Sequence, residues 1–209
     1  MCIRDRDDGK MRVWSETQPT LLSATWPAAE KNAIRIVTLV IAGAALLTLS
    51  AKVNIPFYPV PMTMQTFAVL VIGMAFGPSL AIGTVGLYLI LGALGLPVFS
   101  GTPERGIGWA YMAGPTGGYL IGFIAASGIV GVLAQRGYDR SFAMTLASMT
   151  LGTLVVYIFG FVWLAGLIGV EKAWTFGVQP FLVADAFKIL LAAIVLPTAW
   201  CLVGKSTSI

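Results

Sequence analysis

The chain has 209 residues, of which 57% are hydrophobic and 11% are charged, and its mean hydropathy is +0.87. Soluble domains carry about 25% charged residues, so this composition excludes a soluble globular protein and indicates an integral membrane protein. The chain has no histidine, and Cys2 and Cys201 lie at opposite ends, which argues against a disulfide framework and against zinc, haem or iron–sulfur chemistry. We attribute the net charge of +4 to basic residues that set the orientation of the chain in the membrane rather than to nucleic-acid binding.

Residues 1–30 are polar and irregular and predict a poorly ordered tail. Residues 1–10 resemble a cloning or sequence-assembly artefact, and no apolar core follows them, so they are not a signal peptide. We expect a single membrane domain over residues 31–205 and a short C-terminal tail at residues 206–209. Because about 20 apolar residues cross a bilayer, we predict an all-α bundle of six transmembrane helices at residues 33–51, 62–76, 79–96, 117–134, 142–169 and 181–203.

The first predicted span contains small residues, which let another helix approach closely in lipid. They include Ala42, Ala44, Ala45 and Thr48. The functional interpretation is a docking surface for a partner subunit, and the alternative is packing within the same bundle.

Two irregular segments lie between the spans. Three prolines at residues 56–61 rule out a regular helix there, yet the segment is aromatic and apolar, which is typical of a plug or lid. Gln65 then opens the second span with a polar group that can face inward. Residues 97–113 are rich in glycine and aromatic side chains, which favours a binding loop over a solvated linker. Glycines at residues 114–118 would let a ligand approach the backbone at the entrance to the fourth span, although a tight helix entry without a ligand would need the same residues.

The last predicted span carries two charges, Asp185 and Lys188. A charge at mid-membrane costs about 2.5–3.5 kcal/mol on insertion scales. Residues at i and i+3 share one helix face, so the two charges can face one cavity and offset each other. An intramembrane ion pair is by default a functional site, and the alternative is a salt bridge that staples helices together.

The positions of the basic residues predict the topology. Five fall on one side of the predicted spans and three on the other: Lys31, Arg35, Arg136, Arg140 and Lys205 against Lys52, Arg105 and Lys172. The positive-inside rule then places both termini in the cytoplasm. This topology brings the proline-rich segment, the Arg105 loop and the Asp185 end of the last span to the outer side.

The motifs of common enzymes are absent. The sequence Gly-Lys-Ser-Thr at residues 204–207 looks like the end of a phosphate-binding loop, but no strand precedes it and no helix can follow it. Neither G-x-S-x-G nor H-E-x-x-H occurs, and histidine, the usual general base, is missing. We therefore predict that the chain is not an enzyme and does not hydrolyse ATP itself.

Four motifs in order resemble a known family. They are PVPMTMQT at residues 59–66, LGALGLPVF at residues 91–99, GPTGGYLIGF at residues 114–123 and DAFK at residues 185–188. Together they resemble BioY, the biotin-specific S component of energy-coupling-factor transporters of prokaryotic plasma membranes. The resemblance implies a six-helix fold with both termini cytoplasmic and capture of biotin from outside. It also implies docking to a transmembrane coupling subunit driven by two cytoplasmic ATPases, so that only the partners use ATP and the chain needs no cofactor.

The chemistry of biotin fits the residues of these motifs. A carboxylate can accept from the ureido N–H groups and an ammonium can donate to the ureido carbonyl, so the resemblance assigns these roles to Asp185 and Lys188. Aromatic side chains would line the fused rings, and Arg105 or freed backbone N–H groups would hold the valerate carboxylate. The remaining predicted binding residues are Tyr58, Gln65, Arg105, Trp109, Tyr111, Gly114, Thr116, Gly117 and Tyr119.

Two other functions stay open. The chain could be an S component or stand-alone carrier for another vitamin, such as thiamine or riboflavin, although the Asp-x-x-Lys pair argues against these. It could also be a structural membrane protein with a stapling ion pair, which predicts no ligand. Binding and uptake of biotin separate both from the main interpretation.

Overall fold

The structure is a computed structural model that describes residues 18–26, 32–55, 58–104 and 106–206. Within them, four helices are long and apolar enough to cross a membrane. These are α2 (Ala33–Lys52), α6 (Gly117–Gln135), α7 (Phe142–Ile168) and α9 (Phe181–Ser206). Two shorter apolar helices, α3 (Gln65–Phe76) and α4 (Pro78–Ala93), complete the body of the bundle.

Short elements connect these helices. The strands β1 (Asn54–Ile55) and β2 (Met62–Thr63) pair antiparallel, with Asn54 opposite Thr63. The short helices are α1 (Leu21–Thr25), α5 (Gly108–Met112) and α8 (Val170–Gly177). The small sheet holds the segment that leads from α2 to α3 close to the bundle.

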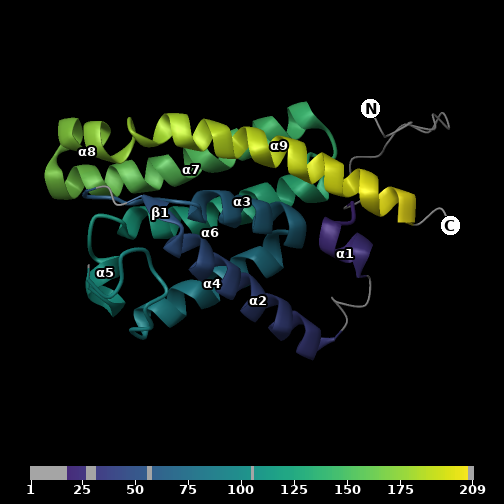
Figure 1. Cartoon of the computed structure of the whole chain (residues 1–209), viewed down its shortest axis with the longest axis horizontal. Helices are drawn as coiled ribbons and strands as arrows, with labels where there is room; N and C mark the ends of the chain where they lie inside the picture. The colour runs from purple at the N-terminus through teal and green to yellow at the C-terminus, as the bar shows by residue number, and fades with distance from the viewer. Residues whose placement is uncertain (1–17, 27–31, 56–57, 105, 207–209) are drawn as a thin grey trace.

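The bundle has two distinct ends (Figure 1). The helices α7 and α9 run side by side, α6 packs against α3, α4 and α7, and α2 packs against α4. The strand β1 and the helices α5 and α8 lie at one end, which we call the hairpin end. The helix α1 and the C-terminal part of α9 lie at the other, which we call the α1 end.

Helix ends are set by local chemistry. The Asn32 side chain accepts a hydrogen bond from the Ile34 N–H at 2.9 Å and so caps α2. The Ser141 hydroxyl caps α7 in the same way, through the Met144 N–H at 3.4 Å. Gly77 adopts φ 78°, which lets α3 turn directly into α4, whose first residue is Pro78.

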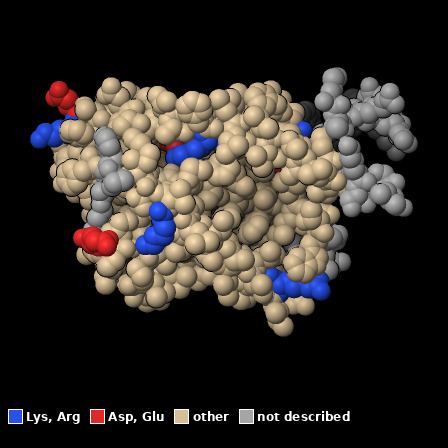
Figure 2. Space-filling view, in the orientation of Figure 1, with Lys and Arg blue, Asp and Glu red and all other residues tan. Residues whose placement is uncertain are grey.

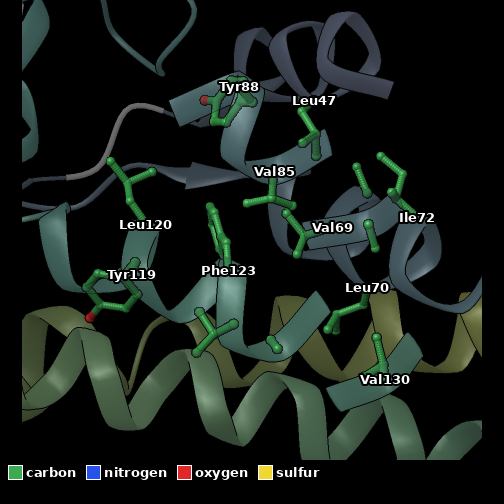
Figure 3. Packing of buried hydrophobic residues seen from close by; sticks show 14 of the residues in the cluster. Leu47, Val69, Leu70, Ile72, Val85, Tyr88, Tyr119, Leu120, Phe123 and Val130 are labelled. Carbon is green, nitrogen blue, oxygen red and sulfur yellow. The ribbon is translucent and has the colours of Figure 1, made fainter. Parts of the chain in front are cut away.

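The inside and outside of the bundle are both apolar. Buried side chains from α2, α3, α4 and α6 meet in one cluster (Figure 3) that includes Leu47, Val69, Tyr88 and Phe123. Large apolar side chains also cover the outer surfaces of α2, α7 and α9, and the face in Figure 2 carries few charged groups. Such a surface suits lipid rather than water.

The predicted spans agree with the helices except at their ends. The second span was predicted from residue 62, but residues 62–63 form β2 because they pair with β1. The third span was predicted to reach residue 96, but α4 ends at Ala93 and Gly95 follows with φ 91°. Residues 170–179, predicted as a loop, contain α8. Residues 18–26 fall within the predicted tail and contain α1, whereas residues 1–10 lie outside the described residues.

A buried carboxylate organises the turn between α6 and α7 at the α1 end. Asp139 is fully buried, and its Oδ2 accepts a hydrogen bond from the Trp200 indole at 2.6 Å. The Arg140 guanidinium lies 4.4 Å from the centre of the same indole ring and donates to the Pro19 carbonyl at 3.2 Å. Burial raises the pKa of the Asp139 carboxyl, and the Trp200 hydrogen bond and the Arg140 charge oppose that rise. The turn thus joins the segment before α1 to α9.

We predict that Trp200→Phe lowers the free energy of unfolding by about 1–3 kcal/mol, because it leaves the buried Asp139 carboxylate without its indole donor. The hydrogen bond favours the charged carboxyl, so the loss should be largest at neutral pH and should shrink as the pH falls and the carboxyl becomes protonated. Unfolding in detergent at several pH values measures this. The control is Trp174→Phe, on the exposed surface of α8, and an equal loss in both variants would contradict the prediction.

Candidate ligand-binding site

The charged pair of α9 lies inside the bundle near the hairpin end. The Lys188 ammonium donates to Asp185 Oδ1 at 2.7 Å, and the two side chains are 12% and 5% exposed. They share one helix face because α9 is regular from Phe181 onward and they stand three residues apart. Pairing offsets much of the cost of removing both charges from water.

Neighbouring elements form further hydrogen bonds with both members of the pair. The Tyr157 hydroxyl on α7 donates to Asp185 Oδ2 at 2.5 Å. Lys188 also donates to the Thr63 carbonyl on β2 at 2.7 Å. The ion pair therefore connects α9 to α7 and to the strand pair at the hairpin end.

The pair faces a cavity that opens to the surface, with about 510 Å³ of empty space when the part open to solvent is included. The walls come from β2, α5 and the longer helices α3, α6, α7 and α9, and they are mostly apolar and aromatic with a few polar groups. They are lined by Val60, Pro61, Thr63, Gln65, Thr66, Tyr111, Thr116, Tyr119, Leu120, Phe123, Val156, Tyr157, Phe181, Asp185 and Lys188. A smaller space of about 200 Å³ touches the ion pair from another side, between α3, α7 and α9.

Two glycines fix Tyr119 against the cavity. Its hydroxyl donates to the Gly177 carbonyl at 2.7 Å, and a Cβ added to Gly160 would stand 2.3 Å from its ring. The ring reaches its place only because α7 has no side chain at Gly160. Figure 3 shows Tyr119 beside Leu120 and Phe123, which line the same cavity.

Polar contacts also fix Gln65 and Tyr111. The Gln65 amide donates to the Tyr88 hydroxyl at 2.6 Å, and that hydroxyl donates to the Val98 carbonyl at 3.3 Å. The Phe99 ring stacks on Tyr111 with 4.8 Å between ring centres. The Lys52 ammonium donates to the Phe99 carbonyl at 3.0 Å, so the end of α2 holds the loop that positions Tyr111.

Metal ions have no evident place in this part of the molecule. Among the described residues, no three His, Cys, Asp or Glu side chains lie close enough together to hold one. The cavity instead offers one carboxylate, one ammonium, hydroxyl and amide groups, and aromatic walls. This set can bind a neutral ring that carries both hydrogen-bond donors and acceptors.

Comparison with known proteins identifies the family. The family model described as "BioY family" matches residues 20–205. The chain belongs to the BioY family.

The sequences of individual BioY relatives match this chain over most of their length. The chain is 42% identical over 159 residues to the probable biotin transporter BioY of Pyrococcus horikoshii, a match that covers 76% of this chain and 92% of that protein. It is 38% identical over 152 residues to the biotin transporter BioY of Thermotoga maritima, covering 72% and 87% respectively. These names denote transport rather than enzymatic catalysis. With the apolar helices, membership in this family makes the chain a multi-pass protein of a prokaryotic plasma membrane.

The fold has also been seen in a solved structure. The crystal structure of the S-component for biotin from an ECF-type ABC transporter has a TM-score of 0.67 to this chain. Its sequence is 24% identical, and the match covers 79% of this chain and 90% of that chain. The BioY chain therefore has the same fold as that S-component.

The structure brings together six of the predicted binding residues around the cavity: Gln65, Tyr111, Thr116, Tyr119, Asp185 and Lys188. Tyr58 and Trp109 do not line it and are 81% and 74% exposed. Gly114 and Gly117 do not line it either, and the Gly114 carbonyl accepts from the Trp163 indole at 3.0 Å. Arg105 lies outside the described residues.

Sequence reasoning missed Tyr157 and the Thr63 carbonyl. Tyr157 stands within the apolar run of α7, where its hydroxyl needs a partner inside the protein because lipid offers none. That requirement was the available signal. The Thr63 carbonyl had no signal, because its contact with Lys188 depends on the strand pair at the hairpin end.

We predict that Gly160→Ala lowers the free energy of unfolding by about 1–3 kcal/mol, because the added methyl group overlaps the Tyr119 ring and forces it to move. The matched control is Gly166→Ala on the same helix, where an added Cβ meets nothing within 4 Å. Unfolding of both variants in detergent measures the difference. Equal stability of the two variants would show that Tyr119 is not confined by Gly160.

Proposed function

We propose that this BioY-family chain is a substrate-binding membrane subunit that captures biotin from outside the cell. The observation that carries the proposal is the Asp185–Lys188 pair, in which Asp185 is buried and Lys188 is 12% exposed, facing a cavity with mostly apolar and aromatic walls. Relatives with 42% and 38% identity are named as a probable biotin transporter and a biotin transporter. Biotin is a small molecule that is neutral at its ring system.

The ureido group of biotin presents an N–H donor beside a carbonyl acceptor. Asp185 and Lys188 present an acceptor beside a donor, on one helix face. In the proposed complex a ureido N–H donates to the Asp185 carboxylate and the Lys188 ammonium donates to the ureido carbonyl. Hydrogen bonds to charged groups are stronger than those between neutral groups, so this pair would supply much of the specificity.

Apolar walls would hold the rest of the ligand. Tyr119, Leu120 and Phe123 on α6 offer a surface for the fused rings. The valerate carboxylate would lie near Thr116, where α6 begins, since the N-terminal N–H groups of a helix favour an anion. Arg105 is a further proposed partner for this carboxylate.

The proposed topology has six spans and cytoplasmic termini. The helices α3 and α4 would cross as the two short spans, beside the four longer helices. Arg35, Arg136 and Arg140 belong to the basic set that is predicted to face the cytoplasm. In the proposed topology this is the α1 end, where α1 and the C-terminal part of α9 lie. The hairpin end would then face outward and receive the ligand.

Energy for inward delivery would come from partners. The proposed assembly contains a transmembrane coupling subunit and two cytoplasmic ATPases, and this chain would bind no nucleotide, cofactor or nucleic acid. Of the small residues predicted for docking on α2, Ala42 and Ala45 are exposed, whereas Ala44 is buried in the core and Thr48 is half-buried. The proposed docking face is therefore narrower than the sequence suggested, and Ala44 serves packing.

We predict that Asp185→Asn together with Lys188→Met weakens biotin binding by more than about 100-fold, because both charge-assisted hydrogen bonds are lost. Equilibrium binding to the purified chain in detergent or nanodiscs measures this. The matched control is Lys172→Met, which removes an exposed lysine of α8 and should leave affinity unchanged.

The other outcomes separate the remaining functions. Tight binding retained in the double variant would make the pair a structural staple. Binding of another vitamin in place of biotin by the folded wild type would make the chain an S component or carrier for that vitamin. Binding of no vitamin at all would favour a structural membrane protein.

A further inference from the structure

The Tyr157 hydroxyl contacts the Asp185 carboxylate and not the proposed ligand. It comes from α7, donates to Asp185 Oδ2 at 2.5 Å and has no part in the ureido contacts described above. Lys188 donates to the other oxygen, Oδ1, at 2.7 Å. Both oxygens of the carboxylate are therefore engaged before any ligand arrives.

This arrangement limits what the carboxylate can accept. An ionised carboxylate has about four lone-pair positions and no donor. Tyr157 and Lys188 occupy one position on each oxygen, so one on each oxygen is left. Because the two donors come from different helices, they also fix the rotation of the carboxylate about its Cβ–Cγ bond. The free lone pairs are thereby held in fixed directions.

We propose that Tyr157 is the positioning residue that aims an Asp185 lone pair into the cavity, and that it thereby sets the requirement for an N–H donor in the ligand. This inference rests on the proposed function, since it assumes that a ureido N–H meets Asp185. Tyr157 acts through Asp185 and lends its own hydroxyl to the carboxylate rather than to the ligand. Without it the carboxylate is held by Lys188 alone and can rotate.

The surroundings of Tyr119 provide an internal comparison. Tyr119 lines the same cavity, but its hydroxyl donates to the Gly177 carbonyl and not to Asp185. Removing either hydroxyl deletes one hydrogen bond made by a tyrosine that lines this cavity. Of the two hydroxyls, that of Tyr157 is hydrogen-bonded to Asp185, the residue that is proposed to accept from the ligand N–H.

The test compares biotin with its two N-methyl ureido isomers, in each of which one N–H is replaced. The isomer that wild type binds more weakly identifies the N–H that meets Asp185. We define discrimination as the ratio of its dissociation constant to that of biotin. Tyr157→Phe should lower discrimination by about tenfold, mainly by weakening biotin. Tyr119→Phe should affect biotin and this isomer equally and leave discrimination unchanged.

Two further side chains at position 157 guard against a folding defect. 4-Fluorophenylalanine fills the space of the hydroxyl without a donor and should lose discrimination as Tyr157→Phe does. 4-Aminophenylalanine restores a donor at the same place and should recover it. Thermal unfolding of each variant in detergent establishes that the chains compared are folded.

The outcomes are distinguishable. Unchanged discrimination in a folded 4-fluorophenylalanine variant that still binds biotin would overturn the role of Tyr157 and leave the proposed function standing. Equal losses of discrimination in the Tyr157 and Tyr119 variants would also overturn it. Failure of wild type to bind biotin would instead sink the proposed function itself.

Discussion

The structure depends on keeping two opposite charges inside a membrane bundle. Asp185 and Lys188 are tolerable there only because each finds polar partners, and these come from separate elements: Tyr157 on α7 and the Thr63 carbonyl on β2. The pair therefore determines how α7, α9 and the strand pair meet at the hairpin end. The cavity between these elements is lined by the carboxylate and the ammonium of the pair. Asp185 and Lys188 therefore both hold the elements of the hairpin end together and supply the charged groups of the site.

Most of the fold could be predicted because membrane-spanning segments are recognisable in a sequence by their length and hydropathy. All six predicted spans correspond to helices, and their errors lie at ends where backbone contacts decide the boundary. The strand pair at residues 54–63 could not be predicted, since a two-residue strand has no periodicity and its partner is set by the return of the chain. The helices α1, α5 and α8 are likewise too short for a pattern to develop.

The site was predictable in part, and the reason differs by residue. Asp185 and Lys188 stand out because charges are rare within an apolar span, and the i, i+3 spacing fixes their common face. The placement of Trp109 could not be predicted, because an aromatic side chain in a glycine-rich loop can point away from the bundle as easily as into it, and Trp109 is exposed. Tyr157 was missed because one hydroxyl scarcely changes the hydropathy of its span, although it changes the chemistry of Asp185.

In the proposed complex the ion pair of α9 binds the ureido ring of biotin, which fixes the orientation of the ligand as well as its identity. A crystal structure of the chain with bound biotin tests this most directly. We expect the ureido carbonyl within hydrogen-bond distance of Lys188 Nζ, an N–H facing Asp185 and the valerate carboxylate near Thr116. A ligand bound the other way round, with its carboxylate on Lys188 and its rings toward Thr116, would show that the ion pair does not bind the ureido ring.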